Sequence, residues 1–491
     1  MKRFSITDLC QIIKAFPVKD ASHERRAMRD GFFTGISIDS RTTKAGDCFF
    51  AIRGENFDGH DYVSDAFAAG AVCAVVSKEL KNSKLEIQNS KFGIQNSKIR
   101  YCLLKVEDTV KAIGDFAREY RRQAGFKVVA ITGSVGKTTT RHIAYHVLSR
   151  HFRVFQSPKN FNNNIGLPLT LLGANPEDQV IIAELGTNHP GEIAYLTRIA
   201  LPDIAVITNV YPAHLEGFGD LQAIIREKLS ISDGFKSDGI LIINADFDQL
   251  TAACQAKDAR FITFGKSARA DYRADNITSN GLGSRFTING TEVYLPLPGP
   301  GNVENALAAC AICSQSGLTI TDFAQAISAR GGLSPLSMRA EVLQLGTLTV
   351  LNDCYNANPA SMKNALVILS NLKLSERRLV FICGDMAELG RQSELLHAEL
   401  GESIAKARVQ FLLAVGKFAK TTAQAAKRTA DSIRHDLQTE CFKNATLACN
   451  NLQKFIKDYD IILVKGSRTA KLEVVVEKLK TQNLIRHTSG G

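Results

Sequence analysis

The stretch AITGSVGKTTT, residues Ala130–Thr140, decides the fold class of this 491-residue chain. It follows a short apolar run and precedes residues that can continue as a helix. Gly133 and Gly136 let the backbone turn its N–H groups inward, Lys137 brings a positive charge to β- and γ-phosphates, and the Thr138 hydroxyl is a Mg²⁺ ligand. Ile131 stands where the usual phosphate-loop motif has its first glycine. A purely structural turn is the alternative, but the strand before and the helix after favour a nucleotide-binding loop.

Short apolar runs alternate with helical stretches on the C-terminal side of this loop. The alternation pauses at residues 330–335, a Gly- and Pro-containing break, and then starts again. The runs are KVVAIT, VIIAEL, IAVITNV and GILIINAD before the break, and LTVLND, LVFICGD, FLLAVG and IILVKGS after it. This order predicts an α/β protein whose mainly parallel sheets are covered by helices, with polar ligands at the carboxyl ends of the strands.

Length and composition restrict the class of protein. A chain of 491 residues with 45% hydrophobic and 22% charged residues is expected to fold into two to four soluble domains, and three fit the breaks. The apolar runs are too short to cross a membrane, and charged residues interrupt the first helix, which favours an amphipathic helix over a signal peptide. Eleven cysteines without regular spacing indicate reduced thiols and a cytoplasmic location. Among them, Cys310 and Cys313 are expected on one face of a buried helix, where they pack in the protein core rather than form a metal or redox site.

The net charge of +11 is spread among acidic residues. No nucleic-acid-binding motif accompanies the cations, so we expect no nucleic-acid partner and attribute the charge to polyphosphate substrates. Residues 78–98 repeat Asn-Ser-Lys at a spacing of seven, which favours an exposed insertion over a coiled coil.

Three polar side chains are candidates for a site beside the loop. Glu184 ends one strand, His214 lies a few residues after the next, and Lys228 lies on a predicted helix. A carboxylate and an imidazole beside a phosphate loop suit one or two divalent ions, although Mg²⁺ takes mainly oxygen ligands. The alternatives are a hydrogen-bonded loop histidine and a solvated lysine.

Eight motifs occur together in a fixed order. They are TGSVGKTTT, NFNNNIGLPLTLL, ELGTNHPGEIAYL, ITNVYPAHLEGFG, NVENALAA, YNANPASM, GDMAELG and VKGSR. In this order they resemble the Mur ligases of peptidoglycan synthesis, and most of all the branch that adds D-alanyl-D-alanine. The resemblance spans roughly residues 36–477 and is interrupted mainly by the Asn-Ser-Lys insertion.

The resemblance implies three domains and an ATP-dependent reaction. Residues 1–106 would bind a UDP-MurNAc-peptide, residues 107–330 would form the P-loop ATPase domain, and residues 331–491 a Rossmann-like α/β domain. A carboxylate of UDP-MurNAc-tripeptide would be phosphorylated by ATP with Mg²⁺, and the amine of D-Ala-D-Ala would then attack the acyl phosphate.

The resemblance also assigns roles to residues of this chain. Lys137, His214 and Lys228 would be catalytic, with Lys228 carbamylated to N6-carboxylysine as in several family members. The metal ligands would be Thr138, Glu184, His214 and Lys228. ATP would contact Gly133, Ser134, Val135, Gly136, Lys137, Thr138, Thr139, Asn305, Arg339 and Asp353. Ser40 and Arg41 would bind UDP beside Gly46, Asp47 and residues 54–60, and the peptide or acceptor would meet Asn162, Asn163, Asn164, Asn188, His189, Tyr355, Asn356, Asn358 and Lys465.

Two positions depart from the family pattern. Gly301 replaces the histidine of a His-Asn pair before the adenine-contacting Asn305, and Asn352 replaces the first acid of an Asp-Asp pair. The alternatives kept open are a sister ligase that adds one amino acid, a folylpolyglutamate synthase, and a P-loop module that only regulates or scaffolds. A monomer is expected.

Overall fold

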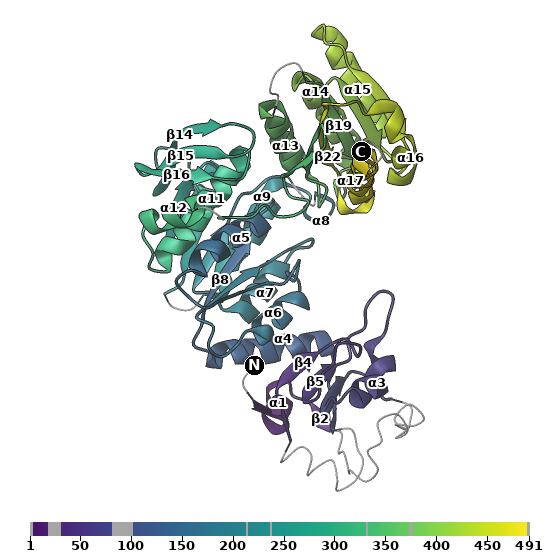
Figure 1. Ribbon diagram of the computed structural model, residues 1–491. Coiled ribbons are helices and arrows are strands. Elements are labelled where there is room, and N and C mark those ends of the chain that lie inside the picture. The colour runs from purple at the N-terminus through teal and green to yellow at the C-terminus, as the bar shows by residue number, and fades with distance from the viewer. Residues whose placement is uncertain are drawn as a thin grey trace.

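The computed structural model describes residues 3–17, 31–80, 102–212, 215–235, 238–329, 332–372 and 377–488. Figure 1 shows three α/β units stacked along the chain, with the N-terminal unit at one end and the C-terminal unit at the other. The predicted three-domain α/β class is confirmed, because each unit is built on its own sheet and the sheets are mostly parallel. The exact domain boundaries at residues 106 and 330 stay a prediction. Most of the Asn-Ser-Lys insertion lies outside the described residues.

The N-terminal unit has a sheet of order β2-β7-β6-β5-β4 and a small antiparallel pair, β1 with β3. Ser5 accepts a hydrogen bond from the Asp8 N–H at 2.9 Å and so starts the helix that the sequence predicts near the N-terminus. The described elements are β1 (Phe4–Ser5), α1 (Ile6–Ile12), β2 (Phe16–Pro17), β3 (Phe32–Phe33), β4 (Gly35–Ser37), β5 (Asp47–Phe50), η1 (Gly59–Tyr62), α3 (Val63–Ala68), β6 (Cys73–Val76) and β7 (Cys102–Lys105).

The middle unit has a sheet of order β16-β15-β14-β13-β12-β11-β8-β10-β9. Its strands are β8 (Lys127–Thr132), β9 (Val154–Gln156), β10 (Val180–Glu184), β11 (Ile204–Ile207), β12 (Ile240–Asn244), β13 (Phe261–Gly265), β14 (Tyr272–Ser279), β15 (Ser284–Ile288) and β16 (Thr291–Leu295). Its helices are α4 (Thr109–Gln123), α5 (Lys137–Leu148), α6 (Gly166–Gly173), α7 (Glu192–Ala200), α8 (Leu215–Phe218), α9 (Leu221–Leu229), η3 (Ser230–Gly234), α10 (Asp248–Ala256), α11 (Pro300–Gln315) and α12 (Ile320–Ser328).

The C-terminal unit has a sheet of order β17-β18-β22-β19-β20-β21, in which only β17 runs antiparallel to its neighbour. Its strands are β17 (Glu341–Leu345), β18 (Leu348–Asn352), β19 (Leu379–Gly384), β20 (Phe411–Val415), β21 (Gln438–Phe442) and β22 (Ile461–Lys465). Its helices are α13 (Pro359–Asn371), η4 (Gly390–Gln392), α14 (Ser393–Lys406), α15 (Ala419–Ser432), α16 (Ala445–Phe455), η5 (Arg468–Ala470) and α17 (Glu473–Thr488).

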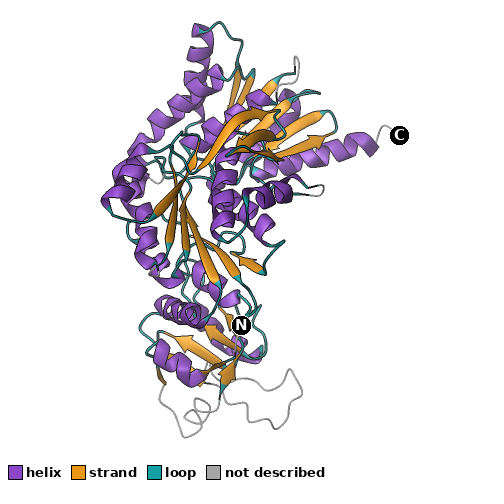
Figure 2. Ribbon diagram, turned by 90° about the vertical axis from the view of Figure 1, so that its left-hand side faces the viewer, coloured by secondary structure: helices purple, strands orange, loops and turns teal. Residues whose placement is uncertain are grey.

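The apolar runs of the sequence become the central strands. The eight runs correspond to β8, β10, β11 and β12 in the middle unit and to β18, β19, β20 and β22 in the C-terminal unit. Helices lie on both faces of these sheets, as Figure 2 shows for the middle unit. The antiparallel extension β14–β15–β16 was not predicted, because its strands are partly exposed and lack a continuous apolar run.

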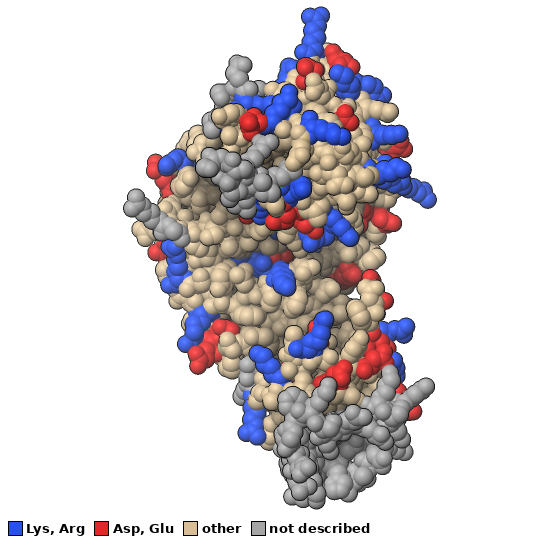
Figure 3. Space-filling view, turned by 45° about the vertical axis from the view of Figure 1, so that its right-hand side comes forward, with Lys and Arg blue, Asp and Glu red and all other residues tan. Residues whose placement is uncertain are grey.

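The burial of the cysteines and the distribution of surface charge agree with what the sequence predicts. All eleven cysteines are free, and Cys310 and Cys313 are fully buried in α11, as expected of core residues. On the face shown in Figure 3, Lys and Arg are interspersed with Asp and Glu. The absence of a nucleic-acid partner stays a prediction. In the described part of the chain, no helix combines the length and the apolar character needed to cross a membrane.

One hydrophobic core joins the N-terminal and middle units. Phe4 and Phe33 pack on Phe116 of α4, with ring centroids 5.2 and 5.6 Å apart, and this cluster continues to the central strands of the middle sheet. Arg121 on the same helix is fully buried. Its guanidinium donates to the carbonyls of Phe126, Ala200 and Leu201 and to Asp203 Oδ2 at 2.7 to 3.1 Å. Helix α4 is therefore fixed to the middle sheet by charge as well as by packing.

We expect Arg121→Ala to lower the free energy of unfolding by about 3–5 kcal/mol, because it removes a buried charged group that donates to Asp203 and to three carbonyls. Urea denaturation measures the loss. Arg122→Ala is the matched control, because Arg122 is the next residue of α4 and its side chain is 61% exposed. An equal, small effect of both substitutions contradicts the anchoring role.

Candidate active site

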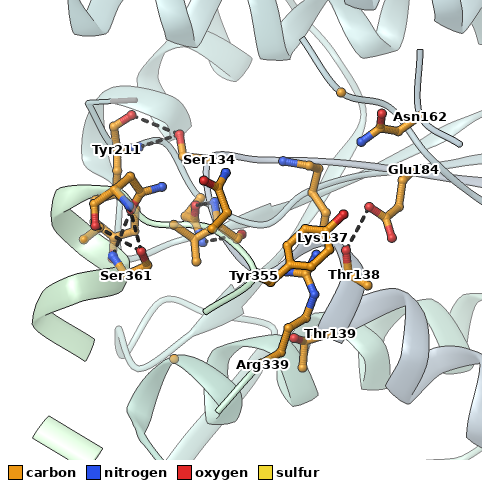
Figure 4. A pocket seen from close by; sticks show the side chains of 18 of the residues that line it. Ser134, Lys137, Thr138, Thr139, Asn162, Glu184, Tyr211, Arg339, Tyr355 and Ser361 are labelled. Carbon is orange, nitrogen blue, oxygen red and sulfur yellow. Dashed lines mark hydrogen bonds between the residues drawn. The ribbon is translucent and has the colours of Figure 1, made fainter. Parts of the chain in front are cut away.

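A cleft of about 1510 Å³ lies between the middle and C-terminal units. From the middle unit it is lined by the phosphate loop, the asparagine-rich loop before α6, the loop after β10 and the start of α11. From the C-terminal unit it is lined by the segment before β17 and by the segment that leads into α13. Figure 4 shows Arg339 and Tyr355 of the C-terminal unit beside Lys137, Thr138 and Thr139.

Most predicted site residues line this cleft. They are Ser134, Val135, Gly136, Lys137, Thr138, Thr139, Asn162, Asn163, Asn164, Glu184, Asn188, Asn305, Arg339, Asp353, Tyr355, Asn356, Asn358 and Lys465. Gly133 and His189 lie next to lining residues, in the phosphate loop and before α7, but do not line the cleft themselves. Lys228 lies on α9, and no residue of this helix lines the cleft. His214, predicted as a catalytic residue and metal ligand, lies outside the described residues. The individual roles of all these residues stay predictions.

The phosphate loop is clamped by the residues that follow β11. The Val135 N–H donates to Asn209 Oδ1 at 2.9 Å, and Asn209 Nδ2 donates to the Val135 carbonyl at 3.0 Å. Thr208 Oγ1 donates to the same carbonyl at 2.6 Å, and Ser134 Oγ donates to the Tyr211 carbonyl at 2.9 Å. These bonds hold the backbone in its turn without using the loop's remaining N–H groups.

Gly136 is required by both conformation and space. Its φ of 90° lies in the left-handed region, which disfavours any residue with a Cβ. A Cβ at this position would also collide with the Asn305 side chain of α11. Asn305 is buried, donates to Asn302 Oδ1 at 3.2 Å and accepts from Thr140 Oγ1 at 3.3 Å. The loop and the start of α11 therefore fit together only through a glycine.

Lys137 lies at the start of α5 among groups of both signs. Its Nζ donates to the Gly133 carbonyl at 2.6 Å. Burial lowers the pKa of Lys137, the negative charge of Glu184 opposes this shift, and the positive charge of Arg339 adds to it. The charge of Arg339, which comes from the C-terminal unit, therefore reaches the phosphate loop.

Thr138 and Glu184 form a pair suited to a hard cation. Thr138 Oγ1 donates to Glu184 Oε2 at 3.0 Å, which Figure 4 shows as a dashed line. The other oxygen, Glu184 Oε1, is buried and makes no hydrogen bond; it lies 3.1 Å from Arg141 Nε. Within the described ranges, no cluster of three or more His, Cys, Asp and Glu side chains is placed to hold a metal. The donors present fit a Mg²⁺ ion that takes its remaining ligands from phosphate and water.

Lys228 is buried on α9, with 3% of its surface exposed. Burial and, second, the positive charge of Lys137 lower the pKa of Lys228 to about 7, while Glu227 opposes the shift. None of the described residues accepts a hydrogen bond from its amine. Its neighbour Glu227 accepts hydrogen bonds from the backbone N–H groups of Gly191 and Ile193 at 2.7 and 2.8 Å. Glu227 thus fixes the first turn of α7, next to the loop that lines the cleft.

The loops on the peptide side are held by local caps. Asn163 Oδ1 accepts from the Ile165 and Gly166 N–H groups at 3.2 and 2.8 Å and so fixes the turn that leads into α6. Glu192 accepts from the backbone N–H groups of Asn188 and His189. The His189 side chain is 74% exposed. Asn163 therefore has a structural role in addition to its place in the cleft lining.

The lining residues of the C-terminal unit also make contacts within that unit. The guanidinium of Arg339 lies 4.0 Å from the Tyr355 ring centroid, a cation–π arrangement. The Lys465 ammonium is buried and donates to Asp353 Oδ2 at 2.6 Å and to the Asn356 carbonyl at 3.0 Å. Asn358 caps α13 by accepting from the Ser361 N–H at 2.9 Å.

The predicted UDP residues lie in the N-terminal unit, in the turn before β5. Ser40 is half-buried, and Arg41 is 86% exposed and paired with Asp39 Oδ2 at 2.6 Å. Neither of them lines the cleft. Their predicted site is thus separate from the phosphate loop.

The sequence analysis assigned no individual role to three residues of the site: Arg141, Asn209 and Glu227. Arg141 lies one helical turn after Lys137, and this i, i+4 spacing could have placed it beside the same ligands. Asn209 directly follows a strand, but its bonds to the loop depend on two segments 74 residues apart. Glu227 gave no signal, because its partners lie 34 and 36 residues earlier in the chain.

Three models of known protein families match this chain, one in each of the three units. Residues 32–121 match the model of the Mur ligase family catalytic domain, residues 131–313 the Mur ligase middle domain, and residues 338–468 the Mur ligase glutamate ligase domain. The chain is 34% identical to a UDP-N-acetylmuramoyl-tripeptide--D-alanyl-D-alanine ligase of Bacillus subtilis, over 91% of this chain and 93% of the relative.

Solved structures agree with the sequence relatives. A crystal structure of MurF from Acinetobacter baumannii superposes with a TM-score of 0.84 at 29% identity, covering 98% of this chain and 99% of the other. MurF ligase from Thermotoga maritima, solved in complex with ADP, superposes with a TM-score of 0.75 at 25% identity, covering 92% and 98% of the two chains.

We expect Asn209→Ala to weaken ATP binding about tenfold, because it removes both hydrogen bonds that Asn209 makes to Val135 and leaves a loop N–H unpaired. Isothermal titration calorimetry with ADP and ATP measures the change. Asn175→Ala is the control, because Asn175 is an exposed asparagine that does not line the cleft. Unchanged affinity in Asn209→Ala would show that the loop keeps its shape without the clamp.

Proposed function

Because the chain belongs to the Mur ligase family, and to its MurF branch, we propose that it joins D-alanyl-D-alanine to UDP-N-acetylmuramoyl-tripeptide at the expense of ATP. The observation that carries this proposal is the cleft between the middle and C-terminal units. There a phosphate loop with a Thr138–Glu184 pair lines the same space as Arg339 of the C-terminal unit and as asparagine-rich loops. A phosphate donor and a peptide can therefore meet in one place.

The reaction has two steps. A terminal carboxylate oxygen of the tripeptide attacks the γ-phosphorus of ATP, and ADP leaves. The amine of D-Ala-D-Ala then attacks the carbonyl carbon of the acyl phosphate, phosphate leaves, and the nitrogen loses a proton as the amide forms. Because an acyl phosphate is hydrolysed by water, closure of the C-terminal unit over the cleft protects the intermediate.

Residues of the cleft are assigned to these steps as follows. The backbone N–H groups of the loop and Lys137 hold the β- and γ-phosphates, and Arg339 adds positive charge from the opposite unit. Thr138 and Glu184 hold Mg²⁺. When bound, this ion offsets the negative charge on the transferred phosphoryl group. Asp353 and Asn305 complete the ATP site, and His214 completes the metal site.

We assign the remaining substrate contacts by position. Asn162, Asn163, Asn188 and His189, together with Tyr355, Asn356, Asn358 and Lys465, face the peptide and the incoming dipeptide. Ser40 and Arg41 bind the UDP group in the N-terminal unit. The eleven free cysteines favour a cytoplasmic location, and a monomer is proposed.

We further propose that Lys228 carries a carbamate that supports the metal site. Only an uncharged amine reacts with CO₂, and a pKa of about 7 leaves a large uncharged fraction at neutral pH. The product carbamate is an anion with two oxygens, whereas the unmodified ammonium would repel Mg²⁺. The nearby charge of Lys137 would also stabilise an anion at this position.

The alternatives are not favoured. The relatives at this level of identity are D-alanyl-D-alanine ligases along nearly their whole length, which argues against a single-amino-acid ligase or a folylpolyglutamate synthase. A purely regulatory P-loop module would not need peptide-side loops opposite its phosphates.

Mass analysis of the product tests the proposed function. The purified enzyme is incubated with ATP and Mg²⁺, with each UDP-tripeptide in turn (meso-diaminopimelate or lysine as third residue), and with D-Ala-D-Ala or a single amino acid. We expect a UDP-MurNAc-pentapeptide, and fast phosphate release only when both UDP-tripeptide and dipeptide are present. Release that is independent of both substrates contradicts the proposal and favours a nucleotide switch.

We expect Lys228→Ala to be inactive and partly rescued by formate or acetate, because a small carboxylate can replace the carbamate oxygens. Wild-type enzyme depleted of CO₂ should regain activity with bicarbonate, and more readily at pH 8 than at pH 6. The reason is that the uncharged fraction of an amine with a pKa of about 7 rises from about a tenth to about nine tenths over that range. Arg226→Ala, at an exposed position of the same helix, should stay active and should not respond to carboxylates. Full activity of Lys228→Ala would refute the role.

A further inference from the structure

Helix α13 of the C-terminal unit docks on two glycines of the middle unit. Figure 1 shows α13 on the side of the C-terminal unit that faces α11 and β14–β16. A Cβ on Gly299 would lie 2.5 Å from Ile368 Cγ1, and a Cβ on Gly301 would lie 3.0 Å from Asn364 Oδ1. Asn364 and Ile368 are one helical turn apart, so they occupy the same face of α13. The two glycines thus leave room for two side chains from another unit.

The first of these side chains completes the start of α11. This helix begins after Gly299, which has no side chain to accept hydrogen bonds from the free N–H groups of the first turn. The Gly301 N–H instead donates to Asn364 Oδ1 at 3.0 Å. An asparagine of the C-terminal unit therefore does what an N-cap residue usually does within one helix.

The capped turn is also the part of the middle unit that touches the phosphate loop. Asn302 is the residue after Gly301, and its Oδ1 accepts from Asn305 Nδ2 at 3.2 Å. Asn305 in turn packs against Gly136 and accepts from Thr140 Oγ1 at 3.3 Å. A continuous set of contacts thus runs from α13 through the first turn of α11 to the phosphate loop.

We propose that Asn364 is a positioning residue that couples docking of the C-terminal unit to formation of the ATP site, with Gly301 as its required partner. The proposal rests on the proposed function only in taking ATP as the nucleotide. When α13 is docked, the first turn of α11 is capped and Asn302 and Asn305 are held for the nucleotide. When it is undocked, the turn loses its cap. Docking and nucleotide binding therefore favour each other.

The pair Gly301 and Asn364 allows a sharp test, because one substitution should depend on the other. Asn364→Ala removes the cap and should raise the Kd for ADP and the KM for ATP about fivefold, the scale of one lost hydrogen bond, with little change in kcat. Gly301→Ala should also raise the Kd, because a methyl group 3.0 Å from Asn364 Oδ1 forces the Asn364 side chain to shift and weakens the cap. In the Asn364→Ala background the same methyl group has room, and alanine is the better helix former, so the double variant should bind no worse than Asn364→Ala alone.

Asn444→Ala is the matched control. Asn444 caps α16 of the same unit, accepting from the Leu447 N–H at 2.9 Å, but it does not line the cleft. It should lower the melting temperature slightly and leave nucleotide affinity unchanged. Calorimetry with ADP, steady-state kinetics and thermal unfolding are measured on the full-length chain for all variants.

Two results would overturn the inference. The first is an Asn364→Ala variant that binds ADP as the wild type does. The second is a Gly301→Ala substitution that raises the Kd for ADP by the same factor in the wild type and in Asn364→Ala, since the two positions would then act independently. Failure of the wild-type chain to bind ADP or ATP at all would instead refute the proposed function together with the inference.

Discussion

The clamp between the phosphate loop and the end of β11 is the interaction on which the site depends. A loop that exposes several N–H groups to an anion cannot satisfy them within itself, so its shape must be held by other atoms. Here both backbone groups of Val135 are held, the N–H by Asn209 and the carbonyl by Asn209 and Thr208. Because β8 and β11 are neighbours in the sheet, the clamp follows from strand order. The fold thus presents the loop in a binding shape before any nucleotide arrives.

The second constraint is charge. The positive charge of Arg339 lowers the pKa of Lys137, and the positive charge of Lys137 lowers the pKa of Lys228. Glu184 is the carboxylate that opposes these shifts at Lys137 and at Arg141. Burying like charges this close is unfavourable without further anions. A triphosphate supplies such charge, and so would a carbamate on Lys228. The same arrangement that makes the unliganded cleft electrostatically costly makes it selective for polyanionic substrates. This also gives a local reason for the excess of cations seen in the composition.

The sequence allowed the sheet and much of the cleft to be predicted, because both depend on short-range signals. A buried strand such as Val180–Glu184 is a continuous apolar run, and a phosphate loop is a contiguous motif. Contacts between distant segments could not be predicted from one sequence. The position of Asn209 after a strand does not reveal its bonds to the phosphate loop, and nothing near Glu227 in the sequence indicates its bonds to α7. Asn358 was predicted as a ligand contact, and it also caps a helix. Gly301 looked like a departure from the family pattern that weakened the adenine contact. In the structure it is the space into which Asn364 fits, 63 residues later.

The distribution of the cores indicates which unit can move. The N-terminal and middle units share one apolar core through α4, so separating them would expose aromatic rings to water. The C-terminal unit has cores of its own, on the two faces of its sheet. Its contacts with the middle unit include the Gly301–Asn364 hydrogen bond, the bond from His142 of α5 to the Ser334 carbonyl, and a small apolar cluster of Phe218, Ile224 and Leu396. Water can replace hydrogen bonds of this kind at little net cost, whereas it cannot replace a shared core. The C-terminal unit is therefore the one that can open, while the phosphate loop and the N-terminal unit stay fixed relative to each other.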